Sequence, residues 1–200
     1  MAKKILGFNC SPRKGKTTCF ALDTCLNAAR TYDPQLETEL IELGPLEIKD
    51  CRDCGTCRDK LTCSIEDDFI PLIEKLRDPD LKAIVIASPV YMGSVTGRGK
   101  ALLDRTVMFR RNNFLLKNKV GGVIAVGGSR NGGQELTIQG IQAAMLIHNM
   151  IVVSDAPASA HFGAALWARH PGGIEEDKEG IQTARNLGRK IAEIINRMNA

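Results

Sequence analysis

The chain alternates between short apolar runs and longer segments in which apolar residues recur every three or four positions. The short runs are rich in Val, Ile, Leu and Ala and predict buried strands. They cover residues 4–9, 36–43, 81–87, 119–126 and 151–153. The longer segments have the periodicity of amphipathic helices. They cover residues 17–30, 66–77, 99–111, 134–149 and 178–198.

Strands that alternate with helices predict an α/β fold, in which a parallel sheet is covered on both faces. Five such strands in 200 residues indicate a flavodoxin-like, doubly wound, five-stranded sheet of order 2-1-3-4-5. We expect one domain over residues 1–200, with residues 44–65 inserted as a loop after the second strand. Ligands of such sheets bind at the carboxyl ends of the strands, so the loops there are the candidate site.

The inserted loop holds four cysteines with the spacing C-x2-C-x2-C-x5-C, namely Cys51, Cys54, Cys57 and Cys63. Compact spacing of this kind favours a [4Fe–4S] cluster, which implies electron transfer. The chain has no second set, so Cys63 is expected to close the same cluster. Structural zinc stays open as an alternative, although its cysteines usually form two separate pairs. A disulfide framework is disfavoured because the chain shows no secretory leader, and we expect a reducing, cytoplasmic compartment.

The loop after the first strand is rich in hydroxyl and basic side chains next to the start of a predicted helix. Such a loop is suited to a phosphate group. The candidate residues are Ser11, Arg13, Lys16, Thr17 and Thr18.

A nucleotide triphosphate fits this loop poorly. Cys10 occupies the position of the first P-loop glycine, and Pro12 lacks a backbone N–H. No G-x-G-x-x-G fingerprint follows any predicted strand. A single phosphate monoester fits better, and flavin mononucleotide (FMN) is the predicted ligand.

The loops after the third and fourth strands contain glycines that allow the backbone to approach a flat ring. Backbone polar groups there would tune a flavin's electronic properties. The candidate residues are Pro89, Val90, Tyr91, Met92 and Gly93 in one loop and Gly127, Gly128, Ser129 and Gly132 in the other. Ring contact and ordinary loop packing both remain open for Tyr91.

Composition and charge limit the classes of partner that the protein is expected to bind. The formal net charge is +4, but basic and acidic residues are mixed along the chain, so nucleic-acid binding has little support. No apolar run is long enough to span a bilayer, so we expect no membrane association. His148 lies near the C-terminus of a predicted helix, where a protonated imidazole would complement the helix dipole.

These motifs together resemble the iron–sulfur flavoproteins, flavodoxin-like relatives of the NAD(P)H-dependent FMN reductases. The resemblance runs through Ser11-Pro12-Arg13, the cysteine motif and Ser88-Pro89-Val90-Tyr91, and it covers nearly the whole chain. It implies FMN, one [4Fe–4S] cluster per subunit, and a homodimer or homotetramer in which one subunit's cluster lies near another's flavin. It also implies a ferredoxin-like electron donor or NAD(P)H. Met92 departs from the aromatic residue of many relatives, and residues 156–173 do not align with the family pattern.

Three functional hypotheses follow. The first is a redox relay that couples one-electron donors to two-electron flavin chemistry, with no side chain assigned as a catalytic acid or base. The second is an NAD(P)H-dependent FMN or quinone reductase whose cysteines are structural, with zinc or without metal. The third is a non-enzymatic redox carrier or sensor.

Overall fold

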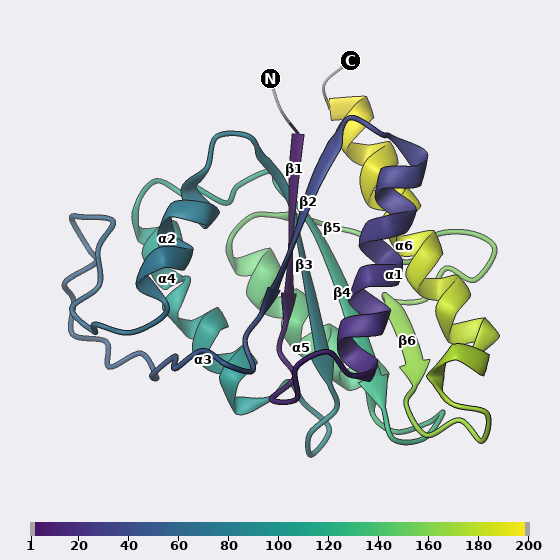
Figure 1. The fold of residues 1–200 in the computed structure, drawn as a ribbon. Coiled ribbons are helices and arrows are strands. Elements are labelled where there is room, and N and C mark those ends of the chain that lie inside the picture. Colours follow the sequence, from purple (N-terminus) through teal and green to yellow (C-terminus); the bar gives the residue numbers. More distant parts are fainter. Residues whose placement is uncertain (1–2, 199–200) are drawn as a thin grey trace.

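Parallel strands form the middle layer of the molecule in the computed structural model, which describes residues 3–198 (Figure 1). The strands are β1 (Lys3–Asn9), β2 (Leu36–Glu42), β3 (Leu81–Pro89), β4 (Val120–Gly127), β5 (Ile151–Val152) and β6 (Ala164–Trp167). The α-helices are α1 (Thr17–Tyr32), α2 (Ile70–Arg77), α3 (Gly97–Arg105), α4 (Val107–Arg111), α5 (Gln134–Ile147) and α6 (Lys178–Met198). A single 3-10 turn, Ile174–Glu176, precedes α6 in the described chain.

The sheet order β2-β1-β3-β4-β5 confirms the predicted topology, and every pairing along it is parallel. One strand, β6, was not predicted. β5 pairs only with Val120 and Gly121, and β6 then pairs with β4 from Ile124 to Gly127. The fifth position in the sheet is therefore shared by two short strands, because the chain leaves the sheet after β5 and returns.

The two faces of the sheet bury separate hydrophobic cores. Alternate residues of β3 point to opposite faces: Ala83 and Val85 join the core under α1 and α6, while Ile84 and Ile86 join the core under α2 to α5. All eight residues of β4 are buried. This is why the central strands read as continuous apolar runs rather than as alternating ones.

Two helix predictions need correction. The helix expected from residue 66 begins at Ile70, because the Asp67 carboxylate accepts a hydrogen bond from the Phe69 N–H (3.1 Å) and holds a turn there. The helix expected over residues 99–111 is two helices that meet at Thr106. The Thr106 hydroxyl bonds the Leu103 carbonyl (2.5 Å), a bond of the kind that bends helices.

None of the helices in residues 3–198 combines the length and the apolar character of a membrane-spanning segment.

Candidate functional site

Three loops meet at the carboxyl edge of the sheet, at the bottom of Figure 1. The Thr96 hydroxyl donates to the Cys10 carbonyl (2.7 Å), which joins the segment after β3 to the loop after β1. The Val90 N–H donates to the Val126 carbonyl (3.0 Å), which joins the same segment to the end of β4. The predicted flavin-binding residues are thus brought together on one edge.

The loop after β1 presents an uncapped helix end. α1 begins at Thr17, and none of the described side chains caps its N-terminus. The first N–H groups of a helix have no partner within the helix and attract anions. Arg13 and Lys16 are exposed beside it, and Gly15 has a φ of +65° that favours glycine. These features suit the phosphate group predicted for this loop.

Glu42, the last residue of β2, contacts this loop and was not among the predicted site residues. Its carboxylate accepts hydrogen bonds from the Asn9 side-chain amide (2.6 Å) and from the Gly15 N–H (2.9 Å). Asn9 and Glu42 are the last residues of two paired strands, so both reach the carboxyl edge together. Their strand-end positions were the available signal, and their role is to hold the loop in place.

The loop after β3 is a tight turn in which Tyr91 and Ser94 exchange two backbone hydrogen bonds of 3.0 Å each. Met92 and Gly93 at its tip have positive φ angles of 49° and 72°. The Met92 side chain is fully exposed and Tyr91 is half-exposed, so both are free to contact a bound ring.

The loop after β4 is held from two sides. The Gln134 side chain donates to the Ser129 carbonyl (2.6 Å) and accepts from the Gly132 N–H (2.7 Å). A Cβ on Gly127 would lie 2.3 Å from the Gln134 amide nitrogen, so any larger residue there would displace the Gln134 side chain from the loop. From β6, the Trp167 indole donates to the Gly128 carbonyl (3.0 Å).

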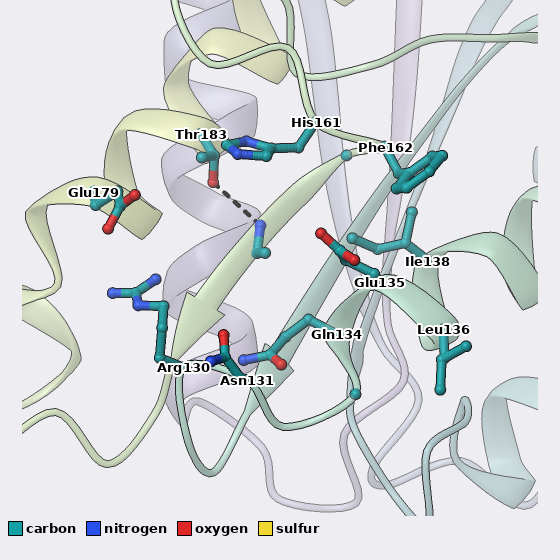
Figure 2. A pocket seen from close by; sticks show the side chains of 13 residues that line it. Arg130, Asn131, Gln134, Glu135, Leu136, Ile138, His161, Phe162, Glu179 and Thr183 are labelled. Carbon is teal, nitrogen blue, oxygen red and sulfur yellow. Dashed lines mark hydrogen bonds between the residues drawn. The ribbon is translucent and has the colours of Figure 1, made fainter.

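A cavity of about 580 Å³ lies beside this loop, between the first turn of α5, β6 and the start of α6 (Figure 2). Arg130, Glu135, His161, Phe162 and Glu179 line it. Residues 156–173, which the sequence left unassigned, therefore supply both the edge strand and part of this cavity's wall.

The inserted loop starts at the same edge but carries its cysteines elsewhere. Arg98 holds its beginning by donating to the carbonyls of Leu43 (2.9 Å) and Gly44 (2.8 Å). The loop then extends beyond α2 and α4, at the left of Figure 1. The cysteines lie against α3 and α4 rather than beside the flavin loops.

Cys51, Cys54, Cys57 and Cys63 are free thiols that line one small cavity. No group of three or more His, Cys, Asp or Glu side chains in residues 3–198 has the arrangement of a closed metal site. Three of the sulfurs already make hydrogen bonds. Cys54 contacts the hydroxyls of Ser64 (3.1 Å) and Thr56 (3.4 Å), which lower its pKa to about 7, while Cys57 and Cys63 each contact an arginine.

The chemistry of this cavity fits a thiolate-bound metal centre. The four thiols are the ligands of both a [4Fe–4S] cluster and a structural zinc. Arg105 lines the cavity, and its buried Nε has no hydrogen-bond partner among the described residues. A buried donor without an acceptor is costly, and a bound group rich in sulfur would supply acceptors.

Two sequence comparisons identify relatives of this chain. The family model described as NADPH-dependent FMN reductase matches residues 3–164. An iron–sulfur flavoprotein of Methanosarcina thermophila is 44% identical over 192 residues, which are 96% of this chain and 95% of that protein.

Solved structures show the same fold. A flavodoxin, WrbA-like protein from Agrobacterium tumefaciens superposes with a TM-score of 0.65 at 15% identity, covering 98% of this chain and 99% of that one. A flavone reductase superposes with a TM-score of 0.73 at 22% identity over 98% of this chain, and the chain spans 64% of that protein's length. The protein is thus an oxidoreductase of the flavodoxin-like flavoprotein class. Within that class, the chain belongs to the iron–sulfur flavoprotein family.

Proposed function

We propose that the protein binds FMN and one [4Fe–4S] cluster and couples one-electron donors to two-electron flavin chemistry. The observation that carries this proposal is the gathering of four free cysteines around one cavity, in a loop inserted into a flavodoxin-like sheet. A cluster transfers single electrons, whereas a flavin accepts one or two.

The FMN phosphate would be held by the loop after β1, with the uncapped start of α1 and the exposed Arg13 and Lys16 supplying donors and positive charge. The ring would lie against the loops after β3 and β4, where Tyr91, Met92 and the glycines leave room for it. These residues bind and orient the flavin. No side chain is assigned a proton transfer.

The cluster would be held by Cys51, Cys54, Cys57 and Cys63. The proposed donor is a ferredoxin-like protein or NAD(P)H, and the net charge of +4 favours an acidic electron carrier. We further propose that the protein is a homodimer or homotetramer and works in a reducing, cytoplasmic compartment.

The first prediction concerns cofactor content. Protein purified anaerobically and reconstituted with iron and sulfide should show flavin and iron–sulfur absorption in one visible spectrum. Cys63→Ala should lose the intact cluster and keep FMN in equal amount, because the cysteine cavity shares no lining residue with the flavin loops. Cys25→Ala, which removes a buried thiol in the middle of α1, is the matched control and should leave both signals unchanged.

A second candidate, an NAD(P)H-dependent reductase with a structural zinc, is favoured by the separation of the cysteines from the flavin loops. Zinc at full occupancy with no iron uptake would establish it and overturn the cluster. The non-enzymatic carrier is tested by steady-state turnover: absence of NADPH oxidation with artificial acceptors would favour it over both enzymes.

A further inference from the structure

Two arginines reach the cysteine cavity from the helices packed against it. The Arg105 guanidinium donates to the Cys63 sulfur (3.3 Å), and the Arg111 guanidinium donates to the Cys57 sulfur (3.3 Å). Both arginines line the cavity together with all four cysteines. Arginine stays protonated in proteins, so each contact brings a permanent positive charge to a thiol.

Arg105 is fixed in a buried position. Its side chain is 1% exposed and pairs with the equally buried Asp67 (2.5 Å), and its guanidinium lies 4.3 Å from the centre of the Phe69 ring. It also donates to the Ile65 carbonyl (3.3 Å). These contacts leave it little freedom to move away from Cys63.

Arg111 is held nearer the surface. Its side chain is 25% exposed and pairs with Asp53 (2.8 Å), which is itself in the cysteine loop. Asn112, the next residue, donates to the Cys57 carbonyl (3.1 Å) and fixes the same part of the loop.

Both arginines end a short helix: Arg105 is the last residue of α3 and Arg111 is the last residue of α4. On a regular helix, two residues six positions apart point about 120° apart around the axis, so they lie on neighbouring sides and not on opposite ones. α3 ends at Arg105 and α4 starts at Val107, and both arginines line the same cavity.

We propose that Arg105 and Arg111 are positioning residues that raise the reduction potential of the cluster. This inference rests on the proposed function. Reduction adds negative charge to a thiolate-bound cluster, so hydrogen bonds to its sulfurs and nearby positive charge stabilise the reduced form more than the oxidised form. Asp53 and Asp67 offset part of that charge and hold the two donors in place.

The test is a potentiometric titration of the cluster, followed by electron paramagnetic resonance of its reduced form. Arg111→Gln removes both the charge and the sulfur contact, and it should shift the midpoint potential to a more negative value. Arg111→Lys keeps the charge and should shift it less. Arg58→Gln is the matched control: it removes an exposed charge from the same loop, and among the described residues Arg58 makes no hydrogen bond to a cysteine sulfur. Arg58→Gln should shift the midpoint potential less than either Arg111 variant.

Arg105→Lys should also move the midpoint to a more negative value, because the single nitrogen of a lysine does not reproduce the two guanidinium nitrogens that bond Asp67 and Cys63. If that buried variant does not fold, the Arg111 series decides the question. Unchanged midpoints in Arg111→Gln, or equal shifts in Arg111→Gln and Arg58→Gln, would overturn the inference. Failure of the unmutated protein to form any cluster would instead overturn the proposed function, and with it this inference.

Discussion

His148 is a buried imidazole whose surroundings favour its neutral form. It is only 6% exposed, and its Nε2 lies 2.8 Å from the Thr106 hydroxyl. That hydroxyl donates its one proton to the Leu103 carbonyl, so it accepts from Nε2–H, and Nδ1 is left buried without a partner in the described structure. Burial, with the nearby positive charge of Arg110, lowers the His148 pKa to about 4. The prediction that a protonated His148 complements the helix dipole is therefore wrong.

This environment predicts a loss of stability in mild acid. The folded pKa of about 4 lies below the unfolded value of about 6.5, so the unfolded chain binds the proton first. His148 should therefore lower the free energy of unfolding by about 2 kcal/mol between about pH 7 and about pH 5. Urea unfolding at both pH values measures this. His148→Gln should show a smaller decrease, and equal decreases in the two proteins would contradict the assignment.

α1 and α6 pack closely on one face of the sheet, side by side at the right of Figure 1. Gly188 in α6 makes this approach possible, because a Cβ there would lie 2.0 Å from the Cys25 carbonyl oxygen of α1. Backbone atoms cannot move aside as a flexible side chain can. Gly140 on α5 is the opposite case: it is exposed, and nothing lies within 4 Å of an added Cβ.

Substitution by alanine should have opposite effects on stability at Gly188 and at Gly140. Gly188→Ala should lower the free energy of unfolding by about 2 kcal/mol, because the two helices must separate. Gly140→Ala should raise it by about 0.5 kcal/mol, because alanine is the better helix former. Thermal and urea unfolding of both variants provide the measurement. A Gly188→Ala protein as stable as Gly140→Ala would show that the helices tolerate a wider separation.

The sequence predicts those elements whose signal is local. Central strands such as β3 and β4 are buried on both faces and read as apolar runs, so the order 2-1-3-4-5 could be predicted. β6 could not be predicted, because its four residues lie in an irregular segment and become a strand only by pairing with β4. The cysteine spacing is likewise local, whereas the contacts of Arg105 and Arg111 with it arise from the packing of distant segments. Glu42 was missed for the same reason.

At the scale of the whole molecule, the two candidate sites lie on different flanks. The flavin loops occupy the carboxyl edge of the sheet, while the cysteine loop extends past α2 and α4 (Figure 1). None of the residues that line the cysteine cavity belongs to the three flavin loops. We propose, as the family resemblance implies, that electrons pass from the cluster of one subunit to the flavin of another, and this separation supports the proposal.

That proposal predicts complementation between two defective subunits. Cys63→Ala should lack the cluster and keep FMN. Arg13→Glu/Lys16→Glu places negative charge on two exposed side chains of the phosphate loop, so it should keep the fold and the cluster but lose FMN. Neither variant alone should reduce flavin with a one-electron donor. Oligomers that contain both subunits should recover flavin reduction, because an intact cluster then lies near an intact flavin in the neighbouring subunit.

The measurement is the rate of flavin reduction in mixed oligomers obtained by co-expressing the two variants with different affinity tags. Oligomers of each variant alone, purified in the same way, are the matched controls, and light scattering determines their size. Mixed oligomers as inactive as the controls would show that transfer occurs within one subunit. A monomer in solution would exclude transfer between subunits altogether, and the cysteine loop would then have to move toward the flavin edge for electrons to pass.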